Sequence, residues 1–326
     1  MISKYKKYNN YTIYLFLLFL LASWFYLPSW SLNIVCLACS NGLVVLSLLV
    51  LMRAGLISFG HGLYYCLGGY SVAISYNFLN IQDAFLLILI TAILGGIVSW
   101  LLGFFVRKFR GIFFAMMNLA LSMILFGIIV KSVSLGSTDG FGIKDLTYFG
   151  FEIIDQVRLN IVSYFFIIVI SFVCILLVSK YTSSSTGKMV LAIKDNEIRA
   201  SYLGINVTQQ IHNVYIISGI LASLGGALMV ILVGHVTPED TAYWTKSGEF
   251  VFVAILSGTM NVIAPLIGSL FFEFIRSYAL YLFPNTWQMT IGIILIVGII
   301  YLPEGLGSII FKLRRIKNAI RSKKTF

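Results

Sequence analysis

Long uninterrupted apolar runs, separated by short polar connections, dominate this sequence. Charged residues make up only 11% of the chain and hydrophobic residues 59%, whereas a soluble domain carries roughly 25% charged residues. A soluble enzyme and a disordered chain are therefore excluded, and an outer-membrane barrel is disfavoured because its strands alternate apolar and polar residues. The sequence predicts an all-α, polytopic integral membrane protein with a single transmembrane domain over residues 1–326.

Ten runs qualify as candidate spans, and ten helices of about 20 residues fit the length of the chain. They cover Tyr11–Leu27, Leu32–Met52, Gly55–Leu79, Ala84–Val106, Ile112–Val130, Ile161–Val178, Val214–Val233, Phe250–Gly258, Val262–Phe283 and Trp287–Leu302. The first is expected to stay as an uncleaved helix, because no small-residue cleavage site follows it. The run Phe250–Gly258 is short and is either a span or half of a broken helix, so the predicted count lies between eight and ten.

Basic residues gather in four short clusters, which all fall on one side of the membrane if the ten runs alternate in direction. The connection 180–212 and the two basic tails, residues 1–10 and 311–326, are therefore predicted to be cytoplasmic, with both termini inside. The more acidic connection 135–160 is predicted to be extracytoplasmic. The net charge of +11 thus indicates topology, and no extended basic face suggests nucleic-acid binding.

A glycine-rich stretch interrupts the third run. Glycine costs a helix roughly 1 kcal/mol relative to alanine, and non-helical backbone within a membrane is tolerated only where it is buried in protein or lines a cavity. The stretch is therefore interpreted as a broken helix beside a translocation path, formed by Gly55, Ser58, Gly60, His61, Gly62, Gly68 and Gly69. Close helix packing explains the glycines equally well, and His61 is expected to hold the break together rather than to contact a substrate.

The connection 180–212 contains a short amphipathic segment. Its apolar side chains Leu191, Ile198 and Leu203 can share one face. A helix here can begin at a cap formed by Asp195 or Asn196 and end at Gly204. Such a helix between spans is expected to dock on a partner protein. The alternative is a helix that lies on the membrane surface.

Catalytic and metal-binding residue sets are missing from the sequence. The three histidines have no metal-ligand spacing, and Cys36 and Cys39 are interpreted as small packing residues within a span. The string around Lys188 lacks the Ser or Thr that follows the lysine of a phosphate-binding loop, so it is rejected as an ATP site. We therefore expect no enzyme activity, cofactor or metal. Glu273 and Arg276, three residues apart on one predicted helix, are expected to pair.

Several short motifs occur in an order that resembles one known family. They are the glycine stretch Gly55 to Tyr70, the segments Phe113–Ala120 and Asp139–Ile143, the connection Ala192 to Asn206, Pro238–Glu239, a degraded hairpin Ser257 to Ser269, and the closing Trp287 to Leu306. Together they resemble the inner-membrane permease subunits of branched-chain amino-acid ABC importers, the M type in particular. The sequence departs from the family at Gly69, Asn118 and Arg199, and in the hairpin.

The resemblance implies a permease subunit in the inner membrane of a bacterium, without an ATPase site of its own. Its implied partners are a second permease subunit, two cytoplasmic ATP-binding subunits, an extracytoplasmic substrate-binding protein and the lipid bilayer. The implied ATPase coupling residues are Asp195, Asn196, Glu197, Arg199, Ala200 and Gly204. The implied cargo is leucine, isoleucine or valine. A related ABC permease for urea, amides or another small polar solute, and an ion-coupled secondary amino-acid transporter, remain as alternatives.

Overall fold

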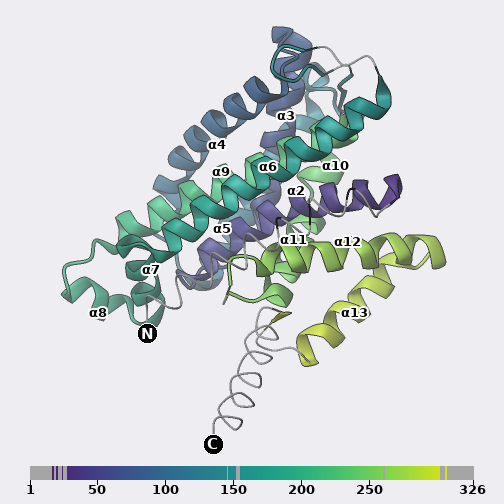
Figure 1. Ribbon diagram of the computed structural model, residues 1–326. Coiled ribbons are helices and arrows are strands. Elements are labelled where there is room, and N and C mark those ends of the chain that lie inside the picture. The colour runs from purple at the N-terminus through teal and green to yellow at the C-terminus, as the bar shows by residue number, and fades with distance from the viewer. Residues whose placement is uncertain are drawn as a thin grey trace, which may run out of the picture.

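The computed structural model describes residues 28–144, 146–151, 155–259 and 261–301, together with Leu17, Leu20, Trp24, Gly305 and Leu306. Apart from one short pair of strands and a 3-10 turn, the described elements are α-helices (Figure 1). The all-α class is therefore confirmed. The first apolar run, both predicted tails and the ends of the chain lie outside the described residues or mostly so.

Five helices are long and apolar enough to cross a membrane. They are α2 (Ser29–Met52), α4 (Ala84–Val106), α5 (Gly111–Lys131), α6 (Gln156–Ser183) and α9 (Val207–Val233). The other predicted runs that are described also form helices, namely α3 (His61–Leu79), α11 (Trp244–Ser257), α12 (Ala264–Leu282) and α13 (Trp287–Tyr301). The structure is that of a multi-pass membrane protein, and the count of ten spans stays a prediction.

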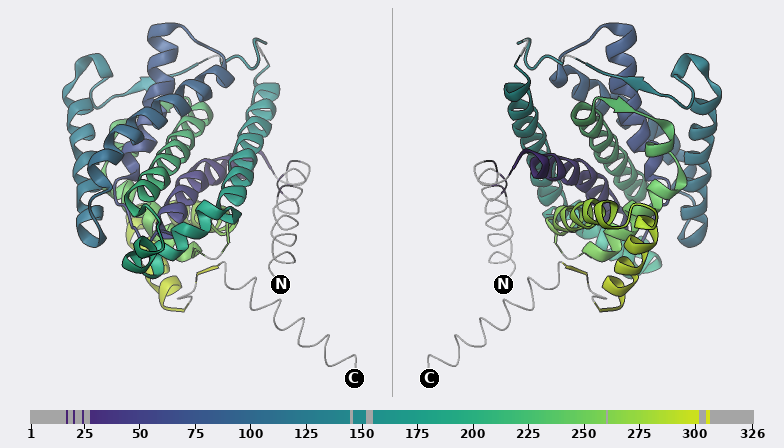
Figure 2. Two further views of the ribbon diagram at one scale, coloured as in Figure 1. Left: turned by 90° about the vertical axis from the view of Figure 1, so that its left-hand side faces the viewer. Right: turned by 90° about the vertical axis from the view of Figure 1, so that its right-hand side faces the viewer.

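Two helices, α2 and α9, lie at the centre of the bundle and pack along each other. Around this pair, α3 and α4 pack on α9, whereas α12, α11 and α6 pack on α2 (Figure 2). The helices α4 and α5 expose most of their apolar side chains, including Phe105 and Ile112. Such a surface is stable only against lipid or another apolar protein face.

Small residues allow the central helices to approach closely. A Cβ atom added at Gly68 of α3 would collide with the backbone carbonyl of Ser223 in α9, and one added at Gly226 of α9 would collide with the carbonyl of Tyr65 in α3. Gly95 of α4 likewise faces the Ser223 side chain. Close approach of backbones is a usual source of helix association in membranes.

One end of the bundle is fastened by backbone hydrogen bonds between distant connections, and we call it the strand end. Strand β1 (Phe141–Gly142) pairs antiparallel with β2 (His235–Val236). Asp83 accepts a hydrogen bond from the amide of Phe85, which caps α4, and one of 2.7 Å from the amide of Gly150. The connection that follows α5 is thus tied to the starts of α4 and α10 (Pro238–Thr241).

The opposite end, which we call the α8 end, carries the two helices α7 (Ser185–Asp195) and α8 (Glu197–Tyr202). The helix α4 runs from the strand end, where it begins at Ala84, to the α8 end, where Arg107 follows it. Its length is about 35 Å at 1.5 Å per residue. Figure 1 shows α7 and α8 together at this end, away from the strands.

Candidate functional site

The interruption in the third apolar run is located before α3, not within it. The non-helical segment covers residues 53–60, between α2 and α3. Gly55 has a φ of +78° and lies beside the Lys194 side chain of α7, so the segment starts at the α8 end. Gly60 faces the backbone of Asn118 in α5 so closely that a Cβ atom there would collide. The segment therefore enters the bundle from the α8 end.

The predicted extent of the break was too long. Gly62, Gly68 and Gly69 are helical residues of α3, whereas Gly55, Ser58 and Gly60 lie in the non-helical segment. The physical reason is that Gly68 packs against the backbone of α9, where only a residue without a side chain fits. This contact does not require α3 to lose its helical hydrogen bonds. For Gly68 the structure thus shows the contact that the packing explanation requires.

His61 is the first residue of α3 and is almost fully buried. Its Nε2 lies 2.7 Å from the Oγ of Ser218 in α9, and that hydroxyl donates to the carbonyl of Ser47 in α2 at 3.1 Å. Because the single hydroxyl proton of Ser218 is used toward Ser47, His61 Nε2 is the donor to Ser218. The chain of bonds ties the start of α3 to both central helices.

The start of α3 lies beside the first turn of α11, roughly midway between the two ends of the bundle. The amide of Gly62 in α3 donates to the Oγ of Ser247 in α11 at 2.9 Å. Ser122 of α5 donates to the carbonyl of Ala242, directly after α10, at 3.1 Å. Since α11 has 14 residues, it is too short to cross a membrane alone. The two helix N-termini place partial positive charge at one internal position.

The position of this meeting point follows from its contacts. Ser218, which bonds to His61, lies about 16 Å beyond the start of α9 at 1.5 Å per residue. The α3 start therefore lies well inside the bundle, roughly midway along a helix that is long enough to cross a membrane.

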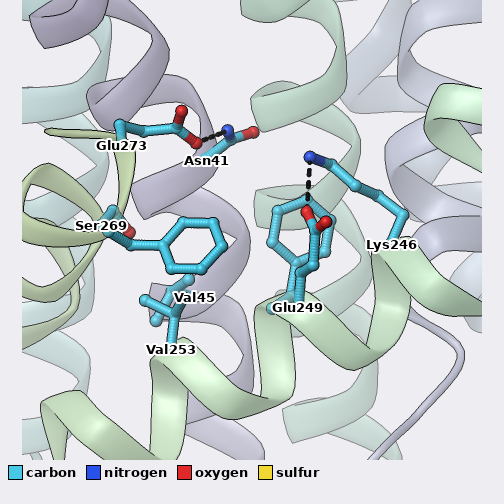
Figure 3. Close-up of a pocket in the computed structure, with 9 residues that line it drawn as sticks. Asn41, Val45, Lys246, Glu249, Val253, Ser269 and Glu273 are labelled. Carbon is cyan, nitrogen blue, oxygen red and sulfur yellow. Dashed lines mark hydrogen bonds and ion pairs between the residues drawn. The ribbon is translucent and has the colours of Figure 1, made fainter. Parts of the chain in front are cut away.

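A second polar group occupies the interface of α2, α11 and α12. Asn41 Nδ2 donates to Glu273 Oε1 at 2.7 Å (Figure 3). The Tyr65 hydroxyl donates to Asn41 Oδ1 at 2.8 Å. The cavity between these helices has a volume of about 10 Å³, which is room for about one water molecule. Ser269 Oγ lines it and has no hydrogen-bond partner among the described residues.

The expected pair of Glu273 and Arg276 is wrong. Arg276 Nη1 lies 3.7 Å from Glu249 Oε2, and Lys246 Nζ lies 3.1 Å from the same oxygen. The guanidinium of Arg276 also lies over the ring of Trp287. Spacing along one helix predicts a pair only when no other element supplies a partner, and here α11 supplies one.

The connection 180–212 forms two helices with very short breaks. Helix α6 continues to Ser183, α7 ends at Asp195, and α9 begins at Val207. Asn196 caps α8 by accepting from the amide of Arg199 at 2.8 Å, and Gly204 follows α8 with a φ of +84°. Of the two predicted caps the structure uses Asn196, whereas Asp195 closes the preceding helix.

The side chains of α8 divide into two groups. Ala200 is buried, while Arg199 is exposed and does not contact the bundle core. The apolar side chains of Ile198, Tyr202 and Leu203 are 69%, 87% and 75% exposed. Leu191, expected on the same face, lies on α7 instead. Three exposed apolar side chains thus follow one another closely in α8 and the residue after it.

Glu197 has a partner that the sequence interpretation missed. Arg110, which precedes α5, places Nε 3.0 Å from Glu197 Oε2 and Nη2 3.0 Å from Glu197 Oε1. Arg110 belongs to the basic connection 107–110, one of the four basic clusters that indicate topology. Two oppositely charged residues in connections predicted on the same side are the signal that could have indicated this pair.

The turn between α11 and α12 also lies at the α8 end. Arg53 Nη2 donates to the carbonyl of Thr259 at 3.4 Å. The α8 end therefore brings together the segment 53–60, the connection 180–212 and this turn. Among the described residues, no group of three His, Cys, Asp or Glu side chains is placed to hold a metal ion.

Comparison with known proteins assigns the fold to a family. Residues 31–300 match the family model described as branched-chain amino acid transport system / permease component. The chain belongs to this family. Its members are membrane components of ABC transporters rather than enzymes, in agreement with the helical bundle.

Two similar proteins are both described as high-affinity branched-chain amino acid transport system permease protein LivM, from Salmonella typhimurium strain LT2 and Escherichia coli strain K12. Each is 24% identical to this chain over 284 residues, which cover 78% of this chain. The alignments span 64% of the length of these relatives. No solved structure matches the chain.

Proposed function

We propose that this chain is a membrane-spanning permease subunit of an ATP-driven importer that carries branched-chain amino acids delivered by a binding protein. Its partners in this proposal are a second permease subunit, two cytoplasmic ATP-binding subunits and an extracytoplasmic binding protein. Family membership supports the transport role, and the printed names of the LivM relatives support the cargo. The observation that carries the proposal is the capped, partly apolar helix α8 at one end of the bundle.

Helix α8 has the properties of a docking element. It is fixed at its start by the Asn196 cap and by Arg110, and at its end by the turn at Gly204. Three exposed apolar side chains in six or seven residues would be costly in water unless a partner covers them. A groove on an ATP-binding subunit is the proposed cover, because helix-in-groove contacts use such side chains.

The positive-inside rule supports the orientation. The basic connections 107–110 and 180–199 meet at the α8 end, as the Arg110–Glu197 contact shows. We therefore place the α8 end in the cytoplasm and the strand end outside. In this orientation the ATP-binding subunits reach α8, and the binding protein reaches the strand end.

The proposed path passes the point where α3 and α11 begin. Helix N-termini within a membrane can bind an anionic group of a substrate with backbone amides. The carboxylate of an amino acid is such a group, and no full positive charge is needed. Gly60, His61 and Gly62 are the predicted site residues at the start of α3. Ser58 accepts from the amide of Gly60, and α11 contributes Ser247.

Two alternatives predict different requirements. A related ABC permease for urea, amides or another small polar solute would use the same docking helix with a different cargo. An ion-coupled carrier would need buried carboxylates in the bundle. Among the described residues Glu273 is the only buried carboxylate, and it already accepts a hydrogen bond from Asn41.

The test is uptake by proteoliposomes that contain this chain with candidate second permease and ATP-binding subunits from the same organism. We expect uptake of labelled leucine that requires the binding protein and internal ATP and that is unaffected by ionophores. Uptake that persists without ATP and collapses with an ionophore would refute the ATP-driven role. Uptake of labelled urea but not leucine would refute the cargo alone.

A docking variant tests α8 separately. Replacing Ile198 with Asp should abolish co-purification of the ATP-binding subunits, because a carboxylate would have to enter an apolar groove. Val133, which is 88% exposed at the strand end, offers a matched control when replaced with Asp. Equal co-purification in both variants would contradict the assignment of α8.

A further inference from the structure

Arg110 lies where the docking helix meets α5, which is the least buried of the five long apolar helices. We propose that Arg110 is a positioning residue that couples α8 to α5, so that movement of α8 by an ATP-binding subunit reaches α5 and, through it, the starts of α3 and α11. This inference rests on the proposed function, because it assigns a transmission route within that importer. Neither the family nor the relatives assign a role to this residue.

The contact is directional rather than a loose ion pair. Two nitrogens of the Arg110 guanidinium face the two Glu197 oxygens at 3.0 Å each, in the planar forked geometry that arginine provides. The remaining nitrogen, Nη1, donates to the carbonyls of Arg107 and Phe109 at 2.6 and 2.8 Å. The guanidinium is thus fixed on both sides, so a displacement of Glu197 must displace the turn that precedes α5.

The position of Glu197 in α8 suits it to transmit a movement of that helix to Arg110. It is the first residue of that helix, directly after the Asn196 cap. A carboxylate at this position is favoured by the helix dipole. Since both side chains of the pair are about one third or more exposed to solvent, the pair contributes little stability. The pair is therefore better explained by the fixed orientation of its two side chains than by a contribution to stability.

Helix α5 is suited to respond. Only four of its residues are buried, namely Phe114, Asn118, Ser122 and Ile129. Two of them contact the proposed path. Asn118 faces Gly60 and accepts from the Tyr215 hydroxyl at 2.7 Å, and Ser122 donates to the carbonyl of Ala242. A shift of α5 would therefore change the surroundings of the segment 53–60 and of the α10–α11 connection together.

A lysine cannot replace this arrangement. Its single ammonium group keeps the charge but cannot face two carboxylate oxygens and two carbonyls in one plane. A purely structural pair would tolerate such a change and would affect only the amount of folded protein. If Arg110 is a positioning residue, the variant complex should still assemble and hydrolyse ATP but should transport less solute for each ATP hydrolysed.

The experiment uses the full reconstituted importer and measures solute transported per ATP hydrolysed, together with the ATP-binding subunit that co-purifies. We expect Arg110→Gln to lower the transport ratio at least tenfold, and Arg110→Lys at least threefold, with co-purification within twofold of wild type. Glu197→Gln, which removes the negative charge that the guanidinium faces, should lower the ratio at least threefold.

The matched control is Arg158→Gln, which removes an arginine from the exposed pair with Asp155 near the strand end and should leave the ratio unchanged. An unchanged ratio in both Arg110 variants or in Glu197→Gln, or a parallel loss of co-purification, would overturn the proposal. If Arg110→Gln is not recovered from membranes, Arg110→Lys and Glu197→Gln decide it. Absence of ATP-dependent uptake by the wild type would instead overturn the proposed function.

Discussion

The hydrogen bond between Asn41 of α2 and Glu273 of α12 permits a quantitative prediction about the stability of the bundle. The perturbation is Asn41→Leu, which keeps the approximate size of the side chain but removes both the donor to Glu273 and the acceptor for Tyr65. Both Asn41 and Glu273 are more than 90% buried, so water cannot readily replace the lost partners.

The expected magnitude follows from these contacts. A hydrogen bond to a charged group contributes about 1.5–3 kcal/mol, and a buried hydroxyl left without its acceptor costs about 1–3 kcal/mol. Hydrogen bonds between membrane helices lie lower, at about 0.6–1.7 kcal/mol. Taking the lower part of each range, about 1 kcal/mol for each lost contact, we expect Asn41→Leu to reduce the free energy of unfolding by about 2 kcal/mol.

A double-mutant cycle isolates the bond to Glu273. In a Glu273→Leu background, Asn41→Leu should cost about 1 kcal/mol, because only the contact with Tyr65 is then lost. The coupling energy is therefore expected to be about 1 kcal/mol, which is in the range of residues in direct contact. Equilibrium unfolding in mixed micelles with increasing SDS, followed by circular dichroism, measures each value.

Asn33→Leu is the matched control, because Asn33 lies on the same helix with an exposed side chain. It should change the unfolding free energy by less than about 0.5 kcal/mol. A coupling energy below about 0.5 kcal/mol, or equal losses for Asn33→Leu and Asn41→Leu, would refute the reasoning that Asn41 is the partner that stabilises the buried carboxylate.

Three further changes test other contacts. Gly68→Leu should reduce the yield of folded protein at least fivefold in size-exclusion chromatography, because the new side chain would collide with the Ser223 carbonyl. Gly127→Leu is the control and should not reduce the yield, since a Cβ there meets nothing within 4 Å. Equal yields would contradict the close approach of α3 and α9. Gly204→Val should abolish uptake while membrane insertion is unchanged, since a β-branched residue at a φ of +84° costs roughly 1–2 kcal/mol or more and reorients α8; normal uptake would argue against α8 as the docking helix. Ser247→Ala removes the acceptor of the Gly62 amide and should destabilise the protein by about 1 kcal/mol, visible as a lower unfolding midpoint; an unchanged midpoint would show that another group, or water, satisfies this amide.

The hydropathy pattern predicted the helices well where a polar residue ends an apolar run. The predicted span Ala84–Val106 coincides with α4, because Asp83 caps its start and Arg107 follows its end. Helix α6 extends beyond the predicted run at both ends, because polar residues at the ends of a helix can reach water or headgroups without ending it. Hydropathy measures apolar length and not backbone hydrogen bonding.

The candidate site was only partly predictable, since it depends on contacts between distant elements. Glycine content identified the stretch 55–69 but could not show that Gly68 packs on α9 while Gly60 lies outside a helix. The partner of Glu273 lies 232 positions away, and that of Glu197 lies 87 positions away. Neither spacing has a local signal, so only the fold shows that Asn41 and Arg110 are the partners.

The two ends of the bundle are held by different kinds of interaction, so we expect ionic strength to affect one end more than the other. The strand end is joined by main-chain hydrogen bonds of β1 and β2, and such bonds respond little to salt. The α8 end includes the partly exposed contact of Arg110 with Glu197, which salt weakens because the Debye length falls from about 10 Å at 0.1 M to about 3 Å at 1 M. Raising the salt concentration should therefore loosen the α8 end first, and hydrogen exchange should report that loss in α8 while the strands stay protected.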